Sequence, residues 1–308
     1  MAEIAPVLPA DRRLRGLLRH GTFAQVLDHA LNARGLSLEQ VRRRLAGQGV
    51  RVSRAALSYW RHGRSRPERA ESLRAVRALE EVLGLPPESL VSLLGPPRPR
   101  GRGAAADPEA IDRKRLWPGH RPLLAELDLP PDSLVRRLDI HEHLRVDEHR
   151  RLTRVHTRLV VEATADRVDR CVVFLWAEGS APALPAEVRY CRPGRVRVDP
   201  EAGATVCELL LDQRLATGER SVLEYTAVYP PGPELTFYHH RFTRPVRQYL
   251  LQAEFAGAPP ATCVPFRQNS VQAPRRPGPP LWIGASRTAH LVLTDVRPGI
   301  AGLAWEWA

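Results

Sequence analysis

The chain of 308 residues lacks several features that would place it outside the cytoplasm. It has no run of about 18 apolar residues, so no segment is expected to cross a membrane as a helix. The N-terminus, with Glu3 and Pro6 and no apolar stretch, does not predict a secretory signal. These absences favour a cytoplasmic protein.

Cysteine is scarce and widely spaced. The four cysteines, Cys171, Cys191, Cys207 and Cys263, form no C-x-x-C pair. This spacing predicts reduced thiols rather than a disulfide framework or a zinc site.

Catalytic motifs are absent as well. There is no G-x-S-x-G, no P-loop and no H-E-x-x-H. We therefore predict no enzyme activity, no catalytic residues, no cofactor and no metal site. His141 and His143 share one face of a predicted strand, which is a possible ligand geometry, but no characteristic spacing completes a site and a polar strand face is favoured.

Positive charge is concentrated in the first third of the chain. Residues 1–103 contain 19 arginines and 9 acidic residues, whereas residues 104–308 contain 27 basic and 25 acidic residues. Lys114 is the only lysine, so part of the arginine excess is compositional. The asymmetry predicts an anionic partner for the N-terminal third.

The hydrophobic period changes from 3.6 to 2 near Leu138, which predicts two fold classes in one chain. The first class is helical. The second comprises about nine to eleven short strands without intervening helices, typical of an antiparallel β-sandwich or barrel. We predict an α+β multidomain protein with a basic extension at 1–21, a helical domain at 22–94, a Pro/Gly/Arg linker at 95–108, a short helical connector at 109–138 and an all-β domain at 139–308.

Three helix signals follow one another in the helical domain. Apolar residues recur at helical spacing from Phe23 to Leu31, and Gly35 ends that helix. Ser37 and Gln40 have the spacing of a capping box that begins a second helix. Ser53 is expected to cap a third.

The third helix has the features of a DNA-reading helix. Leu57 and Trp60 are expected to anchor it in the core, while successive residues diverge by about 100° and turn Tyr59 outward. The outward residues are small, polar or basic, as close approach to phosphates and bases requires. The predicted DNA-contacting residues are Ser53, Arg54, Ala55, Ser58, Tyr59, Arg61, Arg64 and Arg66.

Residues 22–94 resemble the lambda-repressor-like helix-turn-helix family, which includes Cro and the xenobiotic-response-element regulators. The resemblance rests on "LSLEQVRRRL", "VSRAALSYWRHGRSRP", "LRAVRALEEVLGLP" and "ESL". It implies a five-helix bundle whose third helix enters the DNA major groove. The chain departs from the family by inserting residues in "AGQGVRV" and by placing Arg61 where relatives carry glutamate, which favours phosphate contact over an internal ion pair. The closing "RPGIAGLAWEWA" resembles the end of a β-sandwich appended to actinobacterial regulators and implies architecture alone.

Together these features predict a sequence-specific transcription regulator on the nucleoid, binding double-stranded DNA as a homodimer. Its β-domain would dimerise, sense a small molecule or contact a protein. Two other functions remain open at this point: an interaction adaptor whose helices never meet DNA, and an enzyme domain targeted to DNA. The arginines of 98–102 are also open to two interpretations, a solvated linker or an arm for the minor groove.

Overall fold

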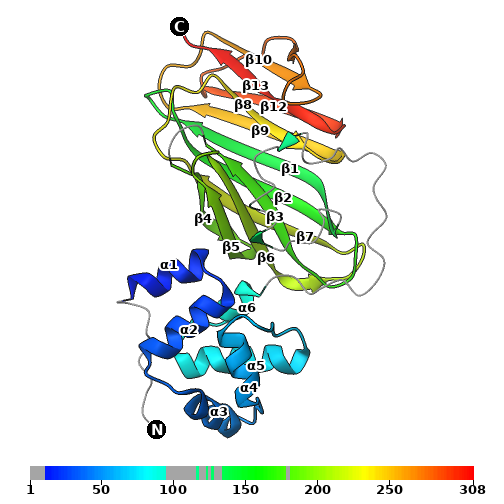
Figure 1. Cartoon of the computed structure of the whole chain (residues 1–308). Helices are drawn as coiled ribbons and strands as arrows, with labels where there is room; N and C mark the ends of the chain where they lie inside the picture. Colours follow the sequence, from blue (N-terminus) through cyan, green and yellow to red (C-terminus); the bar gives the residue numbers. More distant parts are fainter. Residues whose placement is uncertain (1–10, 95–115, 118–122, 124–125, 128–133, 178–180) are drawn as a thin grey trace. The chain divides into compact units, whose positions relative to one another are not determined.

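The structure is a computed structural model that describes residues 11–94, 116–117, 123, 126–127, 134–177 and 181–308 (Figure 1). The chain divides into a helical unit, formed mainly by residues 1–97, and a β unit formed by most of the remainder. The linker at 95–108 and its arginines lie outside the described residues, as does most of the predicted connector. Among the described residues, no helix is long and apolar enough to cross a bilayer.

The described residues of the helical unit form six helices. They are α1 (Arg12–His20), α2 (Phe23–Ala33), α3 (Leu38–Gly47), α4 (Arg54–Arg61), α5 (Ala70–Leu83) and α6 (Ser89–Leu93). The expected bundle of five is therefore wrong in its count. The additional helix is α1, in the segment expected to be an extension: Asp11 caps it by accepting from the Leu14 N–H, and Leu14 is completely buried in the core of the unit.

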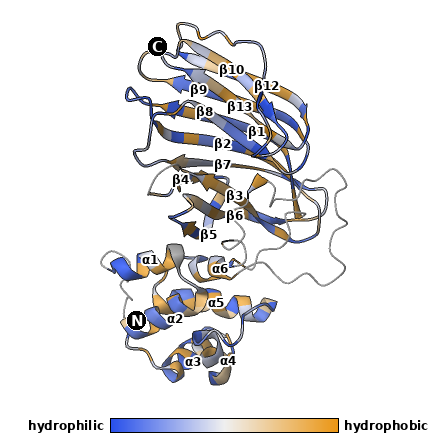
Figure 2. Cartoon of the chain, turned by 45° about the horizontal axis from the view of Figure 1, so that its top comes forward, coloured by the Kyte–Doolittle hydropathy of each residue, from blue (hydrophilic) through white to orange (hydrophobic). Residues whose placement is uncertain are grey.

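Local capping explains where the next helices begin. Thr22 and Ser37 each form a capping box with a glutamine three residues later, Gln25 and Gln40 respectively. The capping box expected from Ser37 is thus confirmed. The apolar stripe of α2 from Phe23 to Leu31 is buried as expected, and hydropathy is correspondingly mixed along α2 and α5 in Figure 2.

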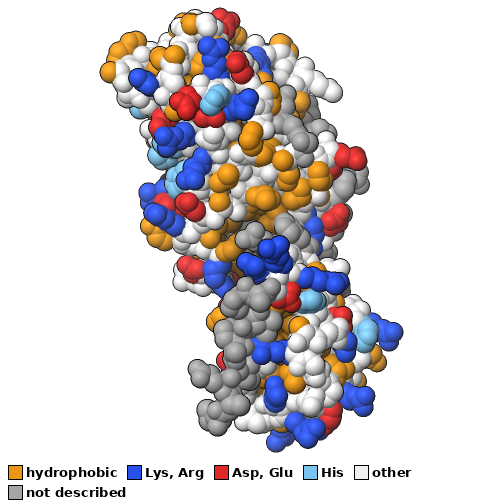
Figure 3. Space-filling model, turned by 90° about the vertical axis from the view of Figure 1, so that its left-hand side faces the viewer, with side chains coloured by type: hydrophobic (Ala, Val, Ile, Leu, Met, Phe, Trp, Pro, Cys, Tyr) orange, Lys and Arg blue, Asp and Glu red, His pale blue; other side chains and the backbone are white. Residues whose placement is uncertain are grey.

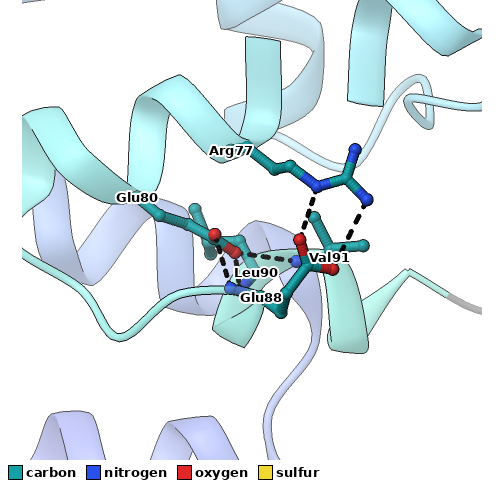
Figure 4. Close-up of polar contacts among 5 residues, drawn as sticks. All are labelled: Arg77, Glu80, Glu88, Leu90 and Val91. Atoms are coloured by element: carbon teal, nitrogen blue, oxygen red, sulfur yellow. Dashed lines mark hydrogen bonds and ion pairs between the residues drawn. The ribbon is translucent and has the colours of Figure 1, made fainter. Parts of the chain in front are cut away.

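The first N–H groups of helix α6 donate to a side chain of α5. The buried carboxylate of Glu80 accepts the N–H groups of Glu88 at 2.7 Å, Leu90 at 2.6 Å and Val91 at 3.1 Å (Figure 4). Arg77 pairs with Glu88 beside it. Burial raises the pKa of Glu80 even though the three N–H groups lower it. Glu80 therefore serves the role that the side chain of an N-cap residue normally has.

The β unit contains thirteen strands among the described residues, more than the sequence predicts. They are β1 (Val135–Val146), β2 (Leu152–Ala163), β3 (Val168–Trp176), β4 (Leu184–Arg189), β5 (Cys191–Asp199), β6 (Ala204–Leu215), β7 (Arg220–Val228), β8 (Phe237–Phe242), β9 (Val246–Phe255), β10 (Thr262–Gln268), β11 (Arg276–Pro277), β12 (Thr288–Val296) and β13 (Gly299–Glu306). Strand β1 begins four residues before the predicted boundary at 139.

These strands form three sheets, with orders β12-β9-β1-β2-β7-β4, β11-β10-β13-β8 and β3-β6-β5. An antiparallel β region is confirmed, although β1 and β9 pair in parallel. Residues Arg137 and Glu142 of β1 lie opposite Val161 and Thr157 of β2, which share one face. Arg137 donates to the Val172 carbonyl of β3, and Glu142 contacts β8. The two smaller sheets therefore pack on the same face of the six-stranded sheet.

Among its described residues before β1, the connector contributes three buried leucines to the β unit. Leu116 packs with Phe266 and Ile300, whereas Leu123 and Leu127 pack with Ala204 and other residues of β3 and β6. The described part of the connector is thus part of the β-unit core.

We predict that Glu80→Ala lowers the free energy of unfolding of the helical unit by about 1–3 kcal/mol, because three backbone N–H groups lose their acceptor. Urea unfolding of the full chain, followed by the helical circular dichroism signal, measures this. The exposed neighbour Glu81 provides the control: Glu81→Ala should stay within about 0.5 kcal/mol of wild type. Equal losses in the two variants would contradict the capping role.

Candidate functional site

Helix α4 is held in the helical unit by one face. Ser53 caps it, with Oγ accepting the Ala56 N–H at 3.1 Å. Leu57 and Trp60 are 1% and 5% exposed, and Ala56 packs against the same core. The predicted helix phase is confirmed, and a large aromatic side chain fixes the orientation of the helix.

The opposite face of α4 is open. Arg54, Ala55 and Tyr59 are exposed, Tyr59 by 49%, and Ser58 is partly exposed. Ser53 accepts the N–H of Ala56. The N–H groups of Arg54 and Ala55, at the first two positions of the helix, have no acceptor within the helix. This end of α4 thus presents free backbone donors and a guanidinium group on one surface, a combination that suits a phosphate group or a base edge.

The turn after α4 presents a second arginine. Gly63 has φ +68°, the left-handed conformation that glycine adopts without strain. Its N–H donates to the Trp60 carbonyl, and the Arg64 N–H donates to the Tyr59 carbonyl at 2.8 Å, which is a Schellman motif. The motif fixes the path of the chain and leaves Arg64 exposed directly after the helix.

Arg61, which was expected to contact a DNA phosphate, forms an ion pair within the helical unit instead. Its Nε donates to Asp28 Oδ1 at 2.6 Å and its Nη2 donates to Asn32 Oδ1 at 2.9 Å. The interpretation that arginine here avoids an internal ion pair is wrong, because α2 supplies an acid within reach. Arg61 joins α4 to α2, so its charge is already compensated. Arg66 is partly buried and also has a partner.

The inserted segment between α3 and α4 is part of the folded unit. Val50 and Val52 pack against the helical core, and the Val50 N–H donates to the Leu45 carbonyl at 2.9 Å. Arg51 lies between the two valines and is exposed. The insertion therefore positions one more basic side chain next to the start of α4.

Exposed arginines precede and follow the start and end of α4 along the chain. Arg51, Arg54, Arg64 and Arg69 are all exposed and form no ion pair with an acid in the part of the chain that the structure describes. Figure 3 shows arginine side chains distributed over the visible face of the helical unit. The site is electropositive through side chains whose charge is mostly uncompensated.

The β unit contains a cavity of about 130 Å³. Its floor is the covered face of β1, β2 and β7, where Glu142, Thr157 and Tyr225 lie directly opposite one another. Its walls are the end of β3, with Phe174 and Trp176, and the strand β8. The cavity occupies the space between the two smaller sheets.

A buried carboxylate lies in this floor. Glu142 is 3% exposed, and Oε1 accepts from His240 Nδ1 at 3.0 Å and from the Tyr238 hydroxyl at 3.3 Å. Oε2 accepts from the Tyr249 hydroxyl at 2.8 Å. Burial opposes the charge, but His240 and the two hydroxyls outweigh it and hold the pKa of Glu142 below its usual value. Burial and the carboxylate raise the pKa of both tyrosines, which keeps them as neutral donors.

Glu142 was not among the residues predicted to be functional. The flanking histidines, considered as possible metal ligands, point to the other face of the sheet: His141 bonds to Gln252 and His143 pairs with Glu254. The described residues include no cluster of three or more potential metal ligands. The signal for Glu142 was present in the pattern, because it follows Ile140 and precedes Leu144 in the buried phase of β1.

Comparisons with known proteins give little further information. No known protein family and no curated protein matches the chain. Among solved structures, a protein from Parabacteroides distasonis, provisionally described as a protease, is similar with a TM-score of 0.35 and 9% identity. The match covers 56% of this chain and 41% of that one, so the chain spans less than half of that protein's length. A similarity this weak supports no conclusion about fold or function.

The lowered pKa of Glu142 predicts a pH dependence. Below its usual pKa of 4.5 the unfolded chain binds more protons than the folded one. The stability that Glu142 contributes is therefore present above pH 4.5 and is lost as the pH falls through the folded-state pKa. We expect the free energy of unfolding of the β unit to fall more steeply below pH 4.5 in the wild type than in Glu142→Gln.

Urea unfolding at a series of pH values, followed by tryptophan fluorescence, measures this. Glu201→Gln, which changes an exposed carboxylate, should follow the wild-type curve. If Glu142→Gln does not fold, Tyr249→Phe tests the same point, because loss of one donor should reduce the pH dependence. If the free energy of unfolding depends on pH in the same way in all variants, Glu142 is not the source of the pH dependence.

Proposed function

We propose that the chain is a sequence-specific DNA-binding transcription regulator whose reading helix is α4. The observation that carries the proposal is the division of α4 into two faces. Leu57 and Trp60 anchor one face in the core, while Arg54, Ala55 and Tyr59 are exposed on the other, where the first two N–H groups of the helix have no acceptor within it. A helix that enters the major groove must be fixed on one side and bear donors on the other.

The flanking arginines give the interface its electrostatic part. Arg51 before the helix and Arg64 and Arg69 after it are exposed, so they are available to the DNA backbone on both sides of the groove. Arg54 is the best candidate for reading sequence, because a guanidinium at the start of the helix can make two hydrogen bonds to guanine O6 and N7. Arg61 is assigned a structural role through Asp28.

We further propose that the chain acts in the cytoplasm on the nucleoid and binds DNA as a homodimer. A homodimer would read two half-sites related by two-fold symmetry. The β unit would then supply dimerisation or sensing. A protein-interaction adaptor with the same helices would instead show no salt-dependent affinity for duplex DNA.

The first test is the salt dependence of binding to random-sequence duplex DNA. Three phosphates neutralised by Arg51, Arg64 and Arg69 correspond to a log–log slope of about −3 per subunit. Fluorescence anisotropy with the full chain between low and physiological salt gives the slope. Arg64→Gln should make it less negative by about 1, whereas Arg214→Gln, at an exposed position of β6, should leave it unchanged. A flat salt response in the wild type would exclude the DNA-binding function.

The second test concerns Arg54. Duplexes selected from a random pool by the wild-type chain provide the preferred sequence. We expect Arg54→Ala to lose about 1–3 kcal/mol of discrimination between this sequence and a scrambled one, while affinity for the scrambled duplex falls much less. Arg64→Ala, a phosphate contact, should weaken both complexes about equally. An unchanged ratio of the two affinities in Arg54→Ala would show that another residue reads the sequence.

A further inference from the structure

The cavity of the β unit has the size and lining of a site for one aromatic ring. An apolar cavity of about 150 Å³ accommodates a benzene molecule, and this one measures about 130 Å³. Trp117, Phe174, Trp176, Tyr229 and Phe237 are among its lining residues. Trp117 and Phe174 stack with their ring centres 5.4 Å apart, so this wall of the cavity is built from two aromatic rings in contact.

The cation Arg241 lines this cavity, and most of its donors have no acceptor among the residues that the structure describes. The guanidinium of Arg241 lies over Trp117, 4.4 Å from the ring centre, and donates through Nε to His239 Nε2 and through Nη1 to the Leu116 carbonyl. These bonds use two of its five N–H groups. Arg241 forms no ion pair with any acid among the residues that the structure describes. A partly buried charge without a counter-ion is costly unless a ligand compensates it.

His239 adds a further donor to the same side. Burial and two nearby arginines lower its pKa to about 3, so the ring is neutral at physiological pH. Its Nε2 accepts from Arg241, and the proton of the neutral ring is therefore on Nδ1. Arg241 and His239 thus offer hydrogen-bond donors and no acceptor to a molecule in the cavity.

The buried carboxylate does not compensate this charge. Along β8, Phe237, His239 and Arg241 alternate with Tyr238 and His240 and point to the opposite face of the strand. Glu142 receives its three hydrogen bonds from Tyr238, His240 and Tyr249. Its charge is stabilised on one face of β8, whereas on the other face Arg241 has no acidic partner within the described part of the chain.

We propose that this cavity binds a small monocyclic aromatic carboxylate. The carboxylate accepts from Arg241 and His239, and the ring lies against the aromatic wall of Trp117 and Phe174. The proposal specifies the ligand class for the sensing role of the β unit in the proposed function. Only the idea that the ligand regulates DNA binding rests on the proposed function, because binding of the ligand in the cavity requires no DNA.

Isothermal titration of the full chain, without DNA, tests the proposal with benzoate as the probe. We expect benzoate to bind at millimolar concentration or below, and the neutral analogue benzamide to bind at least about tenfold more weakly, because it lacks the charge-assisted hydrogen bonds. Arg241→Gln should weaken benzoate binding by at least about tenfold. Arg214→Gln, an exposed arginine that does not line the cavity, should bind like wild type.

Three results would overturn the proposal: no benzoate binding at millimolar concentration, equal binding of benzoate and benzamide, or tighter binding of benzylamine, which would identify Glu142 as the anchor. If Arg241→Gln does not fold, the comparison of benzoate with benzamide on the wild type still shows whether the cavity recognises a carboxylate. Because no step uses DNA, failure here leaves the DNA-binding proposal intact, and the reverse also holds.

Discussion

The hydrogen bonding of Glu142 is the constraint on which the β unit depends. A carboxylate taken out of water is costly unless donors replace its hydration. Here the donors come from two other strands, Tyr238 and His240 on β8 and Tyr249 on β9. Because β1 and β8 belong to different sheets, satisfying this one charge fixes how the four-stranded sheet lies on the six-stranded sheet. The same placement sets one wall of the cavity, since β8 is the strand that carries Arg241.

The helical unit uses a buried carboxylate in a similar way. Glu80 satisfies three N–H groups at the start of α6, so a short helix with no capping side chain of its own is held against α5. Both units therefore rely on an acid inside a mostly apolar core for a geometric purpose. Leucines and valines make up most of the buried area, while the two acids hydrogen-bond specific elements to each other, α5 to α6 and β1 to β8 and β9.

Much of the helical unit was predictable, because its determinants are local. Helical spacing, the Ser37 capping box and the buried phase of Trp60 depend on residues within a few positions of each other. Helix α1 was missed since only three leucines mark its apolar side in an arginine-rich segment, and its cap is a single aspartate. The ion pair of Arg61 with Asp28 spans 33 positions, and nothing in the sequence near Arg61 indicates it.

The sequence predicts the all-β class of the β unit, but it does not predict which strands pair or how the sheets pack. Period-2 alternation identifies strands, but the partner of each strand is a long-range property. The bulge between Arg137 and Asp139 reverses the facing of the first residues of β1, so alternation alone assigns them to the wrong side. The cavity combines Arg241 of β8 with Trp117 of the connector, a pairing that depends on tertiary packing.

The parallel pairing of β1 with β9 has a consequence for how the chain is made. The pairing joins Asp139 to Gln248, so the centre of the six-stranded sheet closes only after a long intervening stretch of chain has been synthesised. Contacts this distant in sequence slow folding, whereas the helical unit is built from local contacts and precedes them. During translation the helical unit can complete its core while β1 and β2 still expose an unpaired strand edge. Because unpaired strand edges favour aggregation, we expect the β unit, rather than the helical unit, to depend on chaperones during synthesis.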